Sequence, residues 1–332
     1  MDLKQRLNLL VQLGEYILQS PRPWQAAKEK AFLENGWFNP EFIDIAVRNI
    51  ATEYLEKNKL ESFANTYNIP GQKGTPKNVG IVMAGNIPLV GFHDFLCTFI
   101  SGHNQTIKLS SRDSVLLSHL TDWMFTKAPE LNGTIRYEVM LKGCDAYIAT
   151  GSNNSARYFE YYFSRFPHII RKNRTSVAIL TGNETMEQLS ALADDVYMYF
   201  GLGCRNVTKI YVPQEYDFVP LLESFRKYNY LFDLHKYKNN YDYQLAVLLI
   251  NKHFYMTNGS VILHQNASLY SPISVLHYEY YDDASTLAAS LKTNDSVQCL
   301  VGTDHIPFGQ TQKPELTDFA DGIDTLQFLL SF

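Results

Sequence analysis

Apolar residues recur every three or four positions over the first 65 residues, which is the spacing of one face of an amphipathic helix. The pattern predicts three helices, over residues 3–17, 24–33 and 40–63. The first helix is expected to end at Ser20-Pro21, because proline cannot continue a helix. We expect these helices to form a layer that packs on the next part of the chain, with a boundary near residue 75.

From residue 78 the pattern changes to short apolar runs that alternate with amphipathic segments. The runs predict strands, and the segments between them predict helices. The predicted strands are 78–84, 105–110, 136–141, 146–149 and 176–180, and the predicted helices are 89–101, 115–127 and 155–165. Asp113 and Ser114 are predicted to cap the helix that starts at residue 115. Strands and helices that alternate in this way indicate a parallel sheet with right-handed crossovers.

A tight loop around Cys204 separates the next predicted helix from the next predicted strand. The helix is predicted over 184–200 and ends at Gly201 and Gly203, and the strand is predicted over 209–213. A thiol on such a loop suits a nucleophile. A lone cysteine in a glycine-rich loop is also often a small buried apolar side chain, so the residues alone leave both interpretations open. Beyond it the pattern predicts helices 219–228 and 243–251, a hairpin of strands 253–257 and 260–264 turning at Asn258-Gly259, and a strand over 273–278.

Charge and composition narrow the range of functions. The formal net charge is −5 over 332 residues and no run of lysine or arginine occurs, which argues against a nucleic-acid partner. The most apolar stretch, 79–100, is interrupted by Asn86, Pro88 and Asp94, so no transmembrane segment is expected. The four cysteines are scattered without metal-ligand spacing, which predicts no metal site and a reduced, cytoplasmic protein.

Four segments, in this order, resemble the aldehyde dehydrogenase superfamily, and most of all its LuxC-type acyl-CoA reductases, the fatty-acid reductases. Ala84-Gly85-Asn86-Ile87-Pro88 is similar to the superfamily's Asn-x-Pro loop after the first strand of the cofactor domain. Thr106 to Ser111 resembles its strand ending in a cofactor-contacting lysine, and Ala149-Thr150-Gly151-Ser152 its Thr-Gly-Ser turn. Gly201-Leu202-Gly203-Cys204 resembles its cysteine loop, and residues 307–325 resemble the C-terminal pattern of the reductases.

The resemblance implies an aldehyde-dehydrogenase-like α/β fold. Its expected parts are an N-terminal helical layer (1–75), a Rossmann-like parallel-sheet cofactor domain (76–175), a second α/β catalytic domain that carries the cysteine (176–300), and a C-terminal segment that returns to the cofactor domain (301–332). The common Gly-x-Gly-x-x-Gly fingerprint does not follow the first strand.

The resemblance further implies reduction of an acyl thioester to an aldehyde. Cys204 would be the nucleophile, and the Asn86 side-chain amide would stabilise the oxyanion. The implied cofactor contacts are Lys108, Ser110, Ser111, Arg112, Thr150, Gly151 and Ser152. Ser111 stands where NAD-preferring members often carry a glutamate that would repel a 2′-phosphate, and Arg112 follows it; these residues favour NADPH over NADH. Without the resemblance, a solvated strand end is the better interpretation of Lys108 and Arg112, and an ordinary turn is the better interpretation of Asn86.

Two departures from the superfamily pattern bear on the reaction. Hydrolytic members carry a glutamate base where this chain has Ile170 to Arg174, a stretch without a carboxylate. A thioester reductase has no need to activate water, so this departure fits the reductive direction. Ser268 replaces the glutamate that would contact the nicotinamide ribose.

Several alternatives remain open at this point. The acyl donor is expected to be acyl-CoA or an acylated protein thioester, and an acyl-transferring partner protein and a homo-oligomer are both compatible with the sequence. An acylating aldehyde dehydrogenase or an acyl-phosphate reductase would use the same cysteine with a different donor. A non-catalytic homologue that binds an acyl chain is the third alternative.

Overall fold

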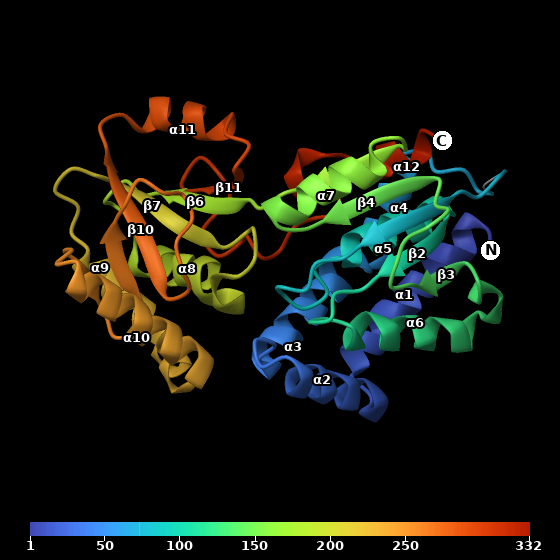
Figure 1. Ribbon diagram of the computed structural model, residues 1–332, viewed down its shortest axis with the longest axis horizontal. Helices are drawn as coiled ribbons and strands as arrows, with labels where there is room; N and C mark the ends of the chain where they lie inside the picture. The colour runs from blue at the N-terminus through green and yellow to red at the C-terminus, as the bar shows by residue number, and fades with distance from the viewer. Residues whose placement is uncertain (73) are drawn as a thin grey trace. The chain divides into compact units, whose positions relative to one another are not determined.

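The computed structural model describes residues 1–72 and 74–332, and it divides into two compact units. Unit 1 comprises Met1–Asn173 and Pro314–Phe332, and unit 2 comprises Arg174–Lys313 (Figure 1). Each unit has its own sheet and its own buried apolar core. The chain therefore leaves unit 1 after its first sheet and returns to it for the last residues.

Unit 1 is built on sheet A, whose five parallel strands follow the order β3-β2-β1-β4-β5. The strands are β1 (Asn78–Val82), β2 (Asn104–Lys108), β3 (Ile135–Tyr137), β4 (Ala146–Thr150) and β5 (His168–Arg171). The order reverses at β1, which has β2 on one side and β4 on the other. The sequence pattern did not predict β5, because exposed His168 and the charged Arg171 interrupt its short apolar run.

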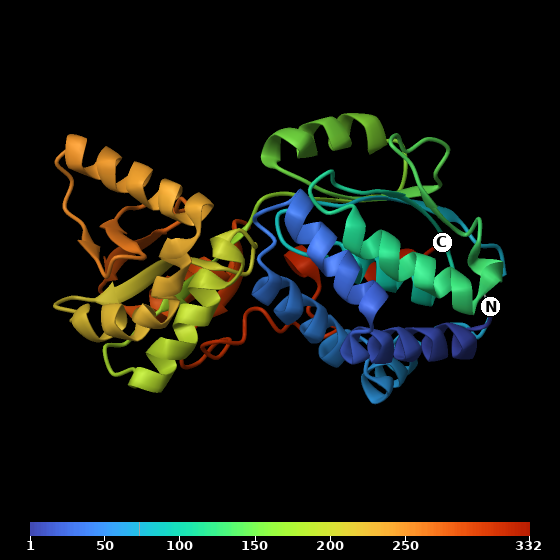
Figure 2. The same cartoon turned by 90° about the horizontal axis from the view of Figure 1, so that it is seen from below.

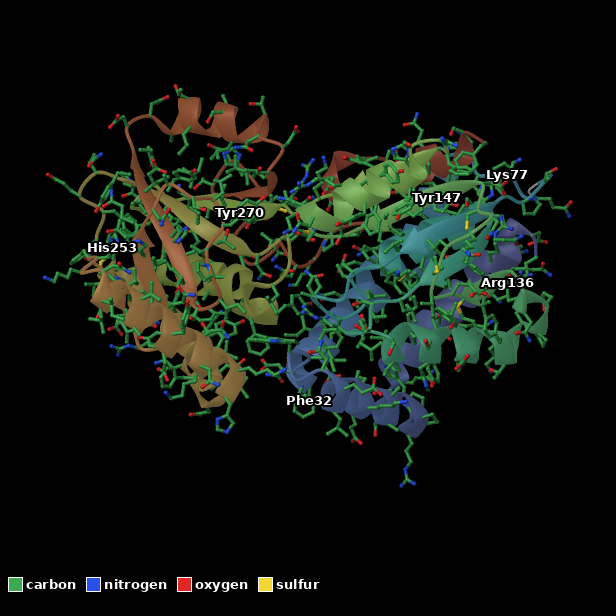
Figure 3. The ribbon with its side chains drawn as sticks, viewed as in Figure 1. Phe32, Lys77, Arg136, Tyr147, His253 and Tyr270 are labelled. Atoms are coloured by element: carbon green, nitrogen blue, oxygen red, sulfur yellow. The ribbon has the colours of Figure 1, made fainter. Side chains whose placement is uncertain are left out.

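Helices cover both faces of sheet A. They are α5 (Phe92–Ser101), α6 (Val115–Lys127) and α7 (Asn153–Phe163), with a 3-10 turn η2 (Pro129–Leu131) between α6 and β3. Figure 2 shows α7 on one face of the sheet and α6 with the N-terminal helices on the other. Tyr147 of β4, labelled in Figure 3, stacks on Phe163 of α7 with ring centroids 4.0 Å apart. The helix predicted over 89–101 begins only at Phe92, because Leu89 has a left-handed backbone with φ of 55°.

The N-terminal layer contains more helices than the sequence pattern predicts. They are α1 (Leu3–Gln19), α2 (Arg22–Glu34), α3 (Pro40–Asn49), the π-helical turn η1 (Ile50–Tyr54) and α4 (Lys57–Thr66). The prediction of one helix over 40–63 was wrong, since the Glu56 side chain accepts the Lys59 N–H at 3.0 Å and starts a new helix. Leu10, Leu13 and Trp24 are fully buried, so this layer belongs to the core of unit 1.

The returning C-terminal residues are bonded to the rest of unit 1. They form a 3-10 turn η5 (Ala320–Gly322) and α12 (Thr325–Leu330). The Tyr67 hydroxyl donates to Asp324 at 2.6 Å. The buried His103 donates from Nε2 to the Leu329 carbonyl at 2.9 Å and accepts the Lys77 N–H on Nδ1. These contacts fix α12 against α5.

Unit 2 is built on sheet B, a six-stranded sheet in the order β11-β6-β7-β10-β9-β8. Its strands are β6 (Thr175–Ile179), β7 (Val207–Pro213), β8 (Met256–Thr257), β9 (Ile262–Gln265), β10 (Val275–Tyr281) and β11 (Val297–Val301). All neighbouring strands are parallel except the β8–β9 hairpin. The hairpin turn at Asn258-Gly259 is confirmed: Asn258 Oδ1 accepts two backbone N–H groups and Gly259 has φ of 94°.

The helices of unit 2 differ from the predicted ranges at several ends. They are α8 (Met186–Tyr197), η3 (Met198–Gly201), α9 (Val219–Ser224), η4 (Phe225–Asp233), α10 (His235–Ile250) and α11 (Ala284–Lys292). The sequence pattern predicted neither α11 nor β11. Among the described residues, no helix is both long and apolar enough to cross a membrane.

Candidate functional site

The residues predicted to bind the cofactor lie together at one edge of sheet A. Lys108 ends β2 and is followed by Ser110, Ser111 and Arg112; Thr150 ends β4 and is followed by Gly151 and Ser152; Asn86 follows β1. The three strands are parallel neighbours, so their carboxyl ends share this edge. The strand order reverses between β2 and β4, which is where α/β sheets bind ligands.

A glycine allows two of these loops to touch. A Cβ on Gly85 would lie 2.5 Å from Ser110 Oγ and 3.3 Å from Arg112 Cβ, so a larger residue would push the loops apart. The Ser110 hydroxyl accepts the Arg112 N–H at 3.2 Å. From the N-terminal layer, Asn35 Nδ2 donates to the Arg112 carbonyl at 3.1 Å. The half-buried Asn86 is therefore carried on a loop that lies directly on the Ser110–Arg112 turn.

This edge has the charge and geometry that suit a phosphate-containing cofactor. Lys108, Arg112 and Ser152 are exposed. Ser152 caps α7 by accepting the Ser155 N–H at 3.2 Å, so the free N–H groups of a helix start lie beside the strand ends. Two cations and a helix N-terminus attract anionic groups, and the residues present therefore fit a dinucleotide.

Cys204 lies in unit 2, on the loop between η3 and β7. All four cysteines are among the described residues; three are buried, and Cys204 is half-buried. Burial raises the pKa of the Cys97 and Cys144 thiols, which keeps them protonated and unreactive. Cys204 is therefore the cysteine best placed to react.

A fully buried asparagine holds the Cys204 loop in place. Asn206 Oδ1 accepts the Gly203 N–H at 2.8 Å, while its Nδ2 donates to the carbonyls of Asp195 at 3.0 Å and Met198 at 2.8 Å. On the other side, the Ser176 hydroxyl donates to the Cys204 carbonyl at 3.0 Å. Sequence reasoning missed Asn206, because its partners come from a helix end that the pattern places incorrectly.

The backbone leading into this loop is strained. Tyr199 and Phe200 have φ of 53° and 57°, and Gly201 follows with φ of 73°. The left-handed region is costly for aromatic residues, at roughly 1–3 kcal/mol each, and such strain gathers at functional sites. The helix has already ended before these residues, because Met198 has a non-helical ψ of 140°; α8 therefore stops at Tyr197, and the predicted end at residue 200 was wrong.

A second loop of unit 2, residues 266–272, carries Ser268 and is anchored through three successive carbonyls. Lys209 Nζ donates to Ala267 O at 2.8 Å, His277 Nδ1 to Ser268 O at 3.0 Å, and Thr208 Oγ1 to Leu269 O at 2.7 Å. The Ser268 hydroxyl donates to the carbonyl of Tyr270, which is labelled in Figure 3.

Lys209, one of these three anchors, was missed by sequence reasoning. Its side chain is completely buried, pairs with Glu279 at 2.5 Å, and lies over the Tyr211 ring at 4.8 Å. The signal that could have revealed it is a lysine inside an otherwise apolar strand.

Asp113 is not the helix cap that the sequence predicts. The N-cap of α6 is Ser114, which makes no side-chain capping bond, while Asp113 accepts the Leu89 N–H at 2.7 Å. A cap is a local contact, whereas this bond joins residues 24 positions apart, so the local sequence favoured the wrong partner.

The stretch 170–174, which has no carboxylate, contains a buried cation. Arg171 of β5 is 4% exposed and pairs with Asp94 of α5 at 2.5 Å. Burial acts to lower the pKa of Arg171, but Asp94 outweighs it, so the net direction is upward and the guanidinium stays charged. Among the described residues, no group of three or more histidine, cysteine or acidic side chains is placed to hold a metal ion.

No family model and no curated protein matches this sequence. Solved structures do match it. Aldehyde dehydrogenase 21 from Physcomitrella patens, in complex with succinate, superposes with a TM-score of 0.67 at 12% identity, over 92% of this chain and 74% of that one. This chain has the aldehyde dehydrogenase fold.

Other solved structures show the same fold. The NAD+ complex of an aldehyde dehydrogenase from Bacillus cereus matches with a TM-score of 0.67 at 14% identity, over 92% of this chain and 73% of that one. An NADP dependent enzyme of E. coli matches with a TM-score of 0.67 at 11% identity, over 91% and 73%. The predicted fold class is thereby confirmed.

Proposed function

We propose that the protein is an NADPH-dependent reductase that converts an acyl thioester to an aldehyde. The observation that carries this proposal is the half-buried Cys204 on a strained loop held by Asn206, in a chain with the aldehyde dehydrogenase fold. The acyl donor is proposed to be an acyl-CoA or an acylated protein. The same chemistry on an acyl phosphate is the second candidate, since it would use the same cysteine.

The Cys204 thiolate attacks the thioester carbonyl carbon, the carbon–sulfur bond of the donor breaks, and the departing thiolate takes up a proton. The product is an acyl group bound to Cys204 through a new thioester. The Asn86 side-chain amide is proposed to donate to the oxyanion of this step, a contribution typically of about 3 kcal/mol. NADPH, when bound, supplies the hydride that reduces the acyl group. The Cys204 thiohemiacetal then collapses, releasing the aldehyde and restoring the thiolate.

The predicted cofactor residues of unit 1 are proposed to hold NADPH. Lys108, Arg112 and the hydroxyls of Ser110 and Ser111 provide cationic and hydroxyl partners for a 2′-phosphate. Thr150, Gly151 and Ser152 are proposed to contact the cofactor at the start of α7. The names of the structural neighbours include both an NAD+ complex and an NADP dependent enzyme, so the preference for NADPH rests on these side chains alone.

Arg171 supports the reductive direction. The stretch 170–174 offers a buried, paired guanidinium and no carboxylate that could activate water. Hydrolysis of the acyl-enzyme is therefore expected to be slow, which leaves the acyl group available for hydride transfer.

The test is NADPH oxidation by the purified protein with acyl-CoAs of increasing chain length, with acetyl phosphate as the alternative donor. Oxidation with acyl-CoA, with aldehyde formed in equal amount, supports the proposal. Turnover with acetyl phosphate alone would favour the acyl-phosphate reductase. If neither donor is turned over and intact mass spectrometry finds no acyl adduct, the catalytic proposal fails and a non-catalytic acyl-binding protein is favoured.

Ser111→Glu is expected to weaken NADPH binding by roughly tenfold and NADH binding much less, because a carboxylate repels the 2′-phosphate. Fluorescence titration of both cofactors measures the two dissociation constants. Asn132→Glu is the matched control, since this exposed residue precedes β3 at the opposite edge of sheet A. Equal weakening of NADPH and NADH would contradict the assigned position of the 2′-phosphate.

A further inference from the structure

Asp113 makes a buried hydrogen bond between two loops of the candidate site in unit 1. Its side chain is 7% exposed, and Oδ2 accepts the backbone N–H of Leu89 at 2.7 Å. Leu89 is the third residue after Asn86, on the loop that follows β1. Asp113 is the residue directly after Arg112, on the loop that follows β2.

The same residue also closes the turn that carries the proposed cofactor contacts. The Asp113 N–H donates to the Ser110 carbonyl at 3.1 Å, so the main chain of Asp113 completes the turn over Ser110–Arg112. Gly85 lies against this turn, where a Cβ would clash with Ser110. The Asn86 loop and the Ser110–Arg112 turn are thus in contact at Gly85 and bonded at Leu89.

The hydrogen bond is made at a residue whose own backbone conformation is unfavourable. Leu89 has φ of 55°, a left-handed conformation that an apolar L-residue seldom adopts without an external partner. The second carboxyl oxygen, Oδ1, is buried without a hydrogen-bond partner among the described residues. Burial raises the pKa of this carboxyl to about 7. A buried carboxyl oxygen without a partner is uncommon in folded proteins and calls for an explanation beyond packing.

We propose that Asp113 is a positioning residue that fixes the Asn86 loop to the Ser110–Arg112 turn. The proposed oxyanion donor and the proposed cofactor contacts are then held as one rigid edge. The effect on turnover rests on the proposed function, whereas the effect on the Leu89 amide does not.

Three variants separate this role from a general effect on stability. Asp113→Ala removes the acceptor of the Leu89 N–H. Asp113→Asn keeps an acceptor oxygen of the same reach and is close to the neutral form of the buried carboxyl. Ser114→Ala is the matched control, because Ser114 is the next residue and its side chain makes no capping bond.

Two measurements are made on each variant. Amide hydrogen exchange of peptides containing Leu89 reports the bond directly, without substrate or cofactor. Steady-state kinetics with the best acyl donor, together with NADPH titration by fluorescence, separate kcat from cofactor binding.

In Asp113→Ala, exchange at Leu89 is expected to be roughly 10-fold to 100-fold faster, because a buried donor loses its partner. The kcat is expected to fall by a similar factor while the NADPH dissociation constant changes by less than about threefold. Asp113→Asn is expected to restore both quantities to within about threefold of the unmodified protein, and Ser114→Ala to leave them unchanged.

Unchanged exchange at Leu89 in Asp113→Ala would overturn the proposal. So would a loss of kcat that Asp113→Asn does not restore, or one that Ser114→Ala reproduces. If the unmodified protein shows no turnover, the proposed function fails, and the exchange and NADPH titration still decide whether Asp113 holds the loop.

Discussion

Cys204→Ala is expected to lower kcat for acyl-thioester reduction by roughly 10⁴-fold or more, because the acyl-enzyme can no longer form. The thiol is the only group in the proposed mechanism that makes a covalent bond to the substrate. Alanine keeps the small size and apolar character of the position, and the Asn206 bonds to the loop use the backbone of other residues. NADPH binding should therefore change little, since the predicted contacts lie in unit 1.

Cys299→Ala is the matched control for this variant. Cys299 is also a thiol of unit 2, but it is buried on β11 and accepts a hydrogen bond from Arg205 Nη1 at 3.4 Å. Its removal is expected to cost some stability and leave kcat within about threefold. Alkylation with iodoacetamide should label Cys204 first, because the other three thiols are buried.

Stopped-flow NADPH oxidation measures the rate of reduction, and intact mass spectrometry detects the acyl group bound to Cys204. The unmodified protein should show an acyl adduct when NADPH is omitted, and Cys204→Ala should show none. Reduction that continues in Cys204→Ala at a rate near that of the unmodified protein would remove Cys204 from the mechanism. An acyl adduct on Cys299 in Cys204→Ala would identify Cys299 as the nucleophile.

The predictions from sequence are most accurate where local signals suffice. The helix predicted over 115–127 is found as Val115–Lys127, because its apolar spacing marks its length even though Asp113 does not cap it. Strands β1 to β4 of sheet A are found within one residue of their predicted starts, whereas β5 was not predicted. The Asn258-Gly259 hairpin is found where its turn residues place it. The order of these elements predicted a parallel α/β sheet, whereas the aldehyde-dehydrogenase-like fold class was implied by the resemblance of four short segments.

Contacts between distant residues set the limit of what sequence could predict. Leu89 and Asp113 meet only because β1 and β2 are neighbours, and nothing near either residue marks the bond. Asn206 likewise takes its partners from the end of α8, where the backbone leaves the helix at Met198. The residue types at the strand ends were therefore predictable, whereas the bonds that hold them in position were not.

The largest stability effect in unit 1 is expected at Arg171. Its Nη1 donates to Asp94 of α5 at 2.5 Å and its Nη2 to Thr325 of α12 at 2.6 Å, so one guanidinium joins β5, α5 and the returning C-terminal helix. Asp94 and Arg171 are 5% and 4% exposed. Arg171→Met is expected to lower the free energy of unfolding of unit 1 by about 3 to 5 kcal/mol, because Asp94 is left buried without its partner.

The neighbouring Lys172→Met is the control for the loss of a positive charge. Lys172 pairs with Glu160 at 2.9 Å, but both side chains are about half exposed, so the expected change is below about 1 kcal/mol. Urea unfolding followed by tryptophan fluorescence measures the free energy of unfolding of unit 1. The chain has three tryptophans, and all belong to unit 1: Trp24, Trp37 and Trp123.

The double variant Asp94→Leu with Arg171→Met shows whether the destabilisation comes from the unpaired Asp94 carboxylate or from lost packing around Arg171. If the unpaired Asp94 carboxylate causes the destabilisation, removing it as well should recover most of the lost free energy, because an apolar pair of similar volume can replace a buried ion pair. If the double variant is as unstable as Arg171→Met, then the contact to Thr325 and the packing of α12 account for the effect. A change below about 1 kcal/mol in Arg171→Met itself would mean that α12 is held by its other contacts, such as those of His103 and Tyr67.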